Sequence, residues 1–80
     1  MSPISREELL EKIRSRSALA GLDLVRVDLS YESLKGVDLS GLDLRDAHLQ
    51  NANLEGADLH GTNLSGAFMF GCNLFRANLT

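Results

Sequence analysis

The feature that most constrains this chain is a large apolar residue at every fifth position from Leu19 to Leu79. A helix turns by about 100° per residue and a strand alternates its faces, so neither would gather residues spaced by five on one side. A coil in which each five-residue unit makes one side and turns a corner would direct them all toward a common axis. The period therefore predicts a solenoid with an interior ladder. Beyond Leu19, the predicted core ladder consists of Leu24, Leu29, Leu34, Leu39, Leu44, Leu49, Leu54, Leu59, Leu64, Met69, Leu74 and Leu79.

The neighbours of each ladder residue keep the same register. Two positions before it the side chain is mostly apolar or small, as at Val37 and Ala57, and Asp or Asn often stands directly before it, as at Asp58. Glycine is frequent two positions after it, as at Gly56. We expect the small residues to face the core, the Asp and Asn side chains to bond nearby amides, and the glycines to permit tight bends.

These units resemble the repeat of the pentapeptide-repeat family. The resemblance is carried by ANLEG, ADLHG and TNLSG in residues 52–66 and by VDLSG from Val37, and it extends over roughly residues 17–80. It implies an all-β solenoid, a right-handed quadrilateral β-helix with four units per coil, so that residues twenty apart stack. We therefore expect residues 18–80 to form a β-helix of about three coils.

The segment 1–17 has a different pattern. Ser5 followed by Glu8 has the spacing of a capping box, which predicts the start of a short α-helix. Leu9, Leu10 and Ile13 would form one apolar stripe, and a helix this short needs tertiary contacts to be stable. We expect this stripe to cap the first end of the β-helix.

Two features suggest irregularity or contact at the ends of the solenoid. Glu32 occupies an inward position, where an unpaired carboxylate is costly, so the first coil should be irregular there. At the other end the repeats continue to Thr80, and an open solenoid end exposes apolar core and unpaired amides. Either the chain is truncated there or this end meets a second molecule. Phe68, Phe70 and Phe75 stand at outward positions near it, and they form either a local lid or, as we favour, a homodimer interface.

The candidate reactive groups predict no catalytic, cofactor-binding or metal site. Cys72 is at an inward position, where a buried thiol is inert. His48 and His60 lie on different sides without a ligand cluster at metal spacing. Ser40, His60 and Asp58 would superficially assemble a triad, but on a flat face without a cleft. We therefore predict that the protein is not an enzyme.

Composition narrows the class of partner. Eight basic and eleven acidic residues give a net charge of -3, which disfavours direct nucleic-acid binding. The sequence has no apolar run of the roughly 18 residues that a membrane span needs, no signal-peptide core and a single cysteine, so we expect a cytoplasmic protein without membrane contact. The predicted function is a structural or protein–protein interaction module whose partner the sequence does not identify.

The resemblance leaves two alternative functions open. Some pentapeptide-repeat proteins mimic DNA and inhibit DNA topoisomerases of the gyrase type, and Asp23 with Asp43, or Asp38 with Asp58, would make stacked acidic columns here. The interspersed basic residues count against this alternative. The chain could also be a spacer domain of a larger bacterial effector or adaptor protein.

Overall fold

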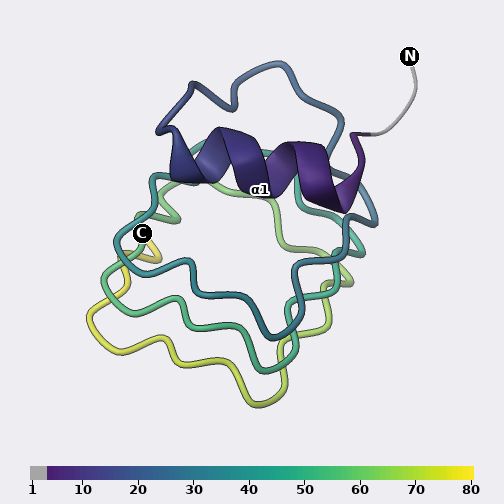
Figure 1. The fold of residues 1–80 in the computed structure, drawn as a ribbon. Helices are drawn as coiled ribbons and strands as arrows, with labels where there is room; N and C mark the ends of the chain where they lie inside the picture. Colours follow the sequence, from purple (N-terminus) through teal and green to yellow (C-terminus); the bar gives the residue numbers. More distant parts are fainter. Residues whose placement is uncertain (1–3) are drawn as a thin grey trace.

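The computed structural model describes residues 4–80 as one α-helix followed by stacked coils of chain (Figure 1). Parallel β-bridges join residues twenty apart, beginning with Asp28 and His48 and ending with Asp58 and Asn78. Four five-residue repeats therefore separate residues that stack, as the resemblance implied. The bridges are isolated, and no longer strand forms within residues 4–80, because the chain turns a corner after each bridge.

Backbone hydrogen bonds tie the middle coil to the coil before it and to the coil after it. The Leu49 N–H donates to the carbonyl of Phe68 in the following coil at 2.8 Å, and the His48 N–H donates to the carbonyl of Val27 in the preceding coil at 2.8 Å. The Leu49 carbonyl in turn accepts the Ala52 N–H at 3.1 Å, which closes the corner. A repeat of five residues thus gives backbone N–H and carbonyl groups hydrogen-bond partners without a continuous strand.

The Asp and Asn side chains stabilise the corners as the register predicts. Before each of nine ladder residues, a side-chain oxygen accepts the amide N–H two positions later, as Asp58 does from His60 at 3.0 Å. The residue two positions after the ladder residue, such as Gly61 after Leu59, has a left-handed backbone conformation, which glycine adopts most easily. Tyr31 adopts the same conformation, with φ 64°. At Gly66 (φ 72°) a Cβ would also overlap the Asp46 carboxylate of the preceding coil.

Burial along the ladder falls toward the C-terminus. The earlier ladder residues are buried, namely Leu24, Leu29, Leu34, Leu39, Leu44, Leu49, Leu54 and Leu59. Leu64, Met69 and Leu74 are half-buried, and the Leu79 side chain is 56% exposed. Leu79 therefore departs from the predicted core, because no further repeat within residues 4–80 packs against its outer side.

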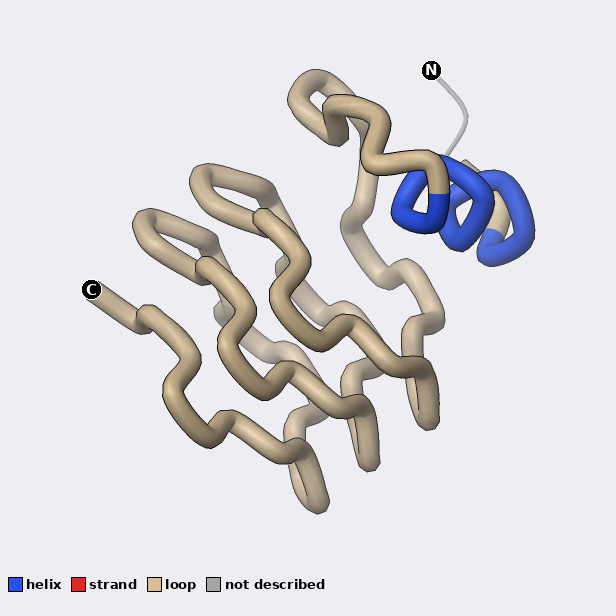
Figure 2. The backbone as a smooth tube through the Cα atoms, turned by 60° about the vertical axis from the view of Figure 1, so that its left-hand side comes forward, coloured by secondary structure: helices blue, strands red, loops and turns tan. Residues whose placement is uncertain are grey.

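The helix α1 (Arg6–Arg14) lies across the N-terminal end of the coils, opposite the C-terminus (Figures 1 and 2). Its N-cap is Ser5, whose side chain accepts the Glu8 N–H at 3.2 Å, as the spacing predicted. Leu9 is 1% exposed, and Leu10 and Ile13 are half-buried and pack against the core. The helix thus covers the apolar core at the N-terminal end of the coils, as a neighbouring coil does further along the solenoid.

The first coil is irregular. Within the described part of the chain, regular bridging to the next coil begins only at Asp28, so residues 19–25 stand apart from the ladder of bridges. The division into residues 1–17 and 18–80 stays a prediction, and residues 1–3 of the expected helical segment lie outside the described residues.

Candidate functional site

Arg6 fastens α1 to the first coil. Its guanidinium donates to the carbonyl oxygens of Asp28 at 3.1 Å and Ser30 at 3.0 Å, and it pairs with the carboxylates of Asp28 and Glu32. The inward Glu32 is thus half-buried and neutralised. Sequence reasoning identified the unusual Glu32 but missed its partner, because the two residues are 26 positions apart.

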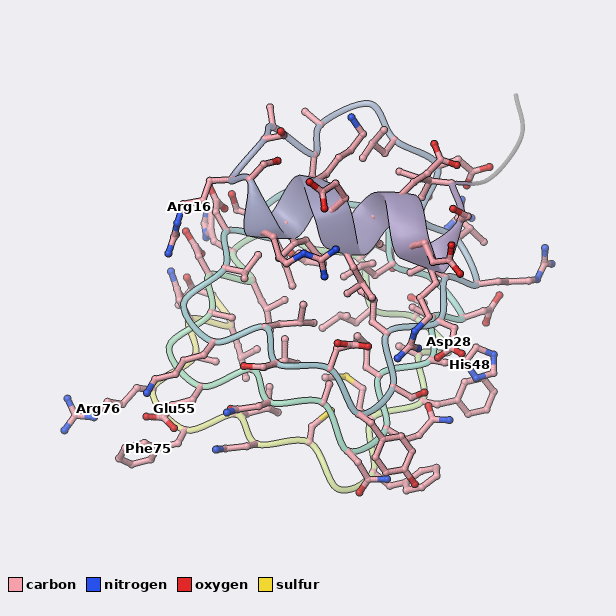
Figure 3. All side chains as sticks on the ribbon, in the orientation of Figure 1. Arg16, Asp28, His48, Glu55, Phe75 and Arg76 are labelled. Atoms are coloured by element: carbon pink, nitrogen blue, oxygen red, sulfur yellow. The ribbon has the colours of Figure 1, made fainter. Side chains whose placement is uncertain are left out.

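Asp28, His48 and Phe68 form a column of unlike residues on one side of the coils, since bridges join each to the next. The side chains of Asp28 and His48 lie beside each other there (Figure 3). The His48 and Phe68 rings stack with their centroids 4.8 Å apart. The Ser30 hydroxyl and amide donate to Asp28 and lower the pKa of its carboxyl, and Arg6 and His48 lower it further. These groups are engaged with one another along the surface and do not converge on a cavity.

The three predicted interface residues all lie on the outside of the last repeats. Phe68, Phe70 and Phe75 are 46%, 68% and 60% exposed. The Arg76 guanidinium lies 5.2 Å from the centre of the Phe75 ring, and both side chains point away from the coils (Figure 3). Phe68 and Phe70 flank Met69 on one side, whereas Phe75 belongs to the next side. The exposed aromatic side chains are therefore divided between two sides of the last coil.

We call the last four repeats, residues 61–80, the C-terminal edge; no other part of residues 4–80 covers the outer side of their backbone. In earlier coils the ladder N–H donates to a carbonyl nineteen positions later, as Leu44 does to Asn63 at 2.8 Å. Within residues 4–80 the N–H groups of Leu64, Met69 and Leu74 have no such acceptor. The C-terminal edge thus combines exposed apolar side chains with a row of backbone groups available for pairing.

The candidate reactive residues do not assemble a reactive centre. Cys72 is half-buried, its thiol donates to the Leu49 carbonyl, and burial raises the pKa of the thiol. The Ser40 hydroxyl donates to Asp38 at 2.6 Å, and His60 Nδ1 lies 3.2 Å from the Thr80 hydroxyl, so Ser40 and His60 are each engaged elsewhere.

The described residues also define what kinds of site the chain carries. Among residues 4–80, no three His, Cys, Asp or Glu side chains are grouped as a metal ion would require. None of the helical structure in that same range is long and apolar enough to cross a membrane.

The acidic columns are partly neutralised. Arg45 donates to both carboxylate oxygens of Asp43, at 2.8 and 2.7 Å, and these hydrogen bonds lower the pKa of Asp43. The Asn78 side-chain amide donates to Asp58 at 3.3 Å. Such local pairing reduces the continuous negative potential on which mimicry of DNA would depend.

Stacked five-residue repeats with variable outward side chains define a repeat protein of the solenoid class. The family model for pentapeptide repeats, in eight copies, matches residues 33–70 and 43–80. The chain therefore belongs to the pentapeptide-repeat family, whose repeats generally form a right-handed quadrilateral β-helix and serve as non-enzymatic structural modules. A comparison with curated proteins gives no match.

Proposed function

We propose that this protein is a non-catalytic interaction module, a right-handed quadrilateral β-helix of about three coils that self-associates through its C-terminal edge. The observation that carries the proposal is the contrast between the middle of the ladder and its C-terminal end. Leu49 is fully buried between two coils, whereas Leu79 is 56% exposed, and Phe70 and Phe75 are more exposed still. Exposed apolar surface of this kind commonly marks an interface.

The free backbone groups of the C-terminal edge are complementary to themselves. The Ala47 carbonyl and the Leu49 N–H both bond to Phe68 in the following coil. By analogy, the Ala67 carbonyl and the Met69 N–H point away from the coils on either side of Phe68. Two such edges related by a two-fold axis would run antiparallel, so the Met69 N–H of each copy could donate to the Ala67 carbonyl of the other. A second copy would therefore satisfy backbone groups and cover apolar side chains in one step.

The test is the molar mass in solution by light scattering, for the wild type and for Leu79→Glu. A wild-type mass of twice 8.7 kDa is expected, and Leu79→Glu should reduce it to 8.7 kDa because the association would bury two carboxylates face to face. Leu79 is exposed, so the substitution leaves the core of the monomer unchanged.

Tyr31→Ser is the matched control, because Tyr31 is 76% exposed but lies outside the C-terminal edge. It should leave the dimer intact. A wild-type monomer at every concentration tested, or a dimer that Tyr31→Ser splits as readily as Leu79→Glu does, would contradict self-association through this edge.

A further inference from the structure

A groove of about 440 Å³ opens between the end of α1 and the first coil. Its size falls in the range in which proteins hold small ligands or short segments. Three parts of the chain meet there: the last turn of α1, the segment from Arg16 to Leu19 that follows it, and the two consecutive repeats around Leu34 and Leu39. The lining residues are Ile13, Arg14, Arg16, Ser17, Leu19, Ser33, Lys35, Val37 and Asp38.

The groove combines an apolar floor with a basic rim. Ile13, Leu19 and Val37 are apolar, with Leu19 only 7% exposed. Arg16 and Lys35 are exposed, and within residues 4–80 neither has an ion-pair partner. This concentration of positive charge occurs in a chain whose net charge is -3.

The other two charged lining residues are already engaged. Arg14 pairs with Glu11 at 3.1 Å, on the exposed side of α1. Asp38, the one carboxylate in the lining, accepts the Ser40 N–H and hydroxyl at 3.0 and 2.6 Å. Arg16 and Lys35 are therefore the groups with free capacity to bind an anion.

The backbone at Arg16 adds a second observation. Arg16 has φ 56°, a left-handed conformation that costs a residue other than glycine about 1 kcal/mol, and its N–H caps the helix by donating to the Ile13 carbonyl at 3.1 Å. Glycine would make the same turn without strain. The chain instead carries an arginine beside the end of α1 (Figure 3), so this turn places a cation at the rim of the groove.

From this geometry we infer that the groove binds a short acidic peptide segment of a partner protein, with carboxylates on Arg16 and Lys35 and an apolar side chain on Ile13 and Val37. A nucleic acid fits less well, because two free cations do not match a row of phosphates and the net charge repels a polyanion. A simple phosphate would leave the apolar floor unused. This peptide site extends the interaction function proposed above, and it lies at the end of the molecule opposite the C-terminal edge.

The experiment is calorimetric titration with the peptide acetyl-Glu-Asp-Leu-Asp-Glu-amide. Its neutral counterpart acetyl-Gln-Asn-Leu-Asn-Gln-amide, the peptide acetyl-Glu-Asp-Ser-Asp-Glu-amide and inorganic phosphate serve as comparison ligands. We expect the first peptide to bind most tightly, and added salt to weaken it, because exposed ion pairs are screened.

Arg16→Gly should weaken this binding about threefold, and Arg16→Gly with Lys35→Ser about tenfold, as expected for losing one and two exposed ion pairs. Arg26→Gly is the matched control, because Arg26 is also exposed and has φ 64° but lies outside the groove. Both glycine variants relieve backbone strain, so loss of folding would not account for loss of binding.

Several results would overturn the assignment of this groove: no binding, equal binding of the neutral or serine peptide, tighter binding of phosphate, or an equal effect of Arg26→Gly and Arg16→Gly. The Leu79→Glu variant should bind the acidic peptide as the wild type does. Peptide binding and self-association can therefore fail independently, and each failure refers to a different end of the molecule.

Discussion

Removing the Arg6 guanidinium by Arg6→Met should destabilise the protein by loosening α1 from the first coil. Methionine keeps an apolar stem but loses the bonds to the Asp28 and Ser30 carbonyls and leaves Glu32 unpaired. Hydrogen bonds to charged groups contribute about 1.5–3 kcal/mol each in favourable cases. Since the Arg6 and Glu32 side chains are 34% and 30% exposed, solvent screening reduces the total, and we expect a loss of about 2 kcal/mol.

The assay is urea unfolding followed by circular dichroism, with Arg14→Met as the matched control. Arg14 also pairs with a carboxylate, that of Glu11, but those side chains are 67% and 72% exposed. Such a pair contributes less than about 0.5 kcal/mol, so Arg14→Met should change the free energy of unfolding very little.

A double-mutant cycle with Glu32→Val separates the ion pair from the carbonyl bonds. Valine suits an inward position, so in the Glu32→Val background Arg6→Met should cost about 1 kcal/mol less than in the wild type. Equal destabilisation by Arg6→Met and Arg14→Met, or a cycle without coupling between Arg6 and Glu32, would refute this role of Arg6.

Three further predictions concern the coils. Leu49→Ala should cost about 3 kcal/mol, whereas Leu79→Ala should cost less than about 1 kcal/mol, because only Leu49 is enclosed by two coils; urea unfolding measures both, and equal losses would contradict the ladder. Gly66→Ala should lower the melting temperature more than Gly61→Ala, since both glycines have positive φ but only the Cβ at Gly66 would overlap a carboxylate; a reversed order would disprove the stacking. The hydrogen bonds from Ser40 lower the pKa of Asp38 below its ordinary value of 3.8, so their contribution to stability is present above pH 3.8 and is lost as the pH falls through the lowered pKa. The stability of Asp38→Asn should therefore fall less steeply in acid than that of the wild type, and identical acid unfolding curves would contradict this account.

The coils and their corners could be predicted from the sequence because their determinants recur every five residues. A leucine such as Leu49 needs only its own repeat to be directed inward, and Asp58 bonds an amide two positions away. The N-cap of α1 at Ser5 has the same local character. Such interactions depend on neighbours in the chain, so the pattern of residues is sufficient to indicate them.

The ends of the molecule depend on contacts between distant residues. The pairing of Arg6 with Glu32, the exposure of Leu79 and the placement of Arg16 and Lys35 on one groove follow from how α1 and the coils pack, and none has a fixed spacing in the sequence. The sequence by itself therefore determined the repeat, its inward ladder and its turns, because these are local and periodic. Only the tertiary structure decided which side chains meet at the helix and which stay uncovered at the last repeats, because these arrangements depend on single long-range contacts that do not recur along the sequence.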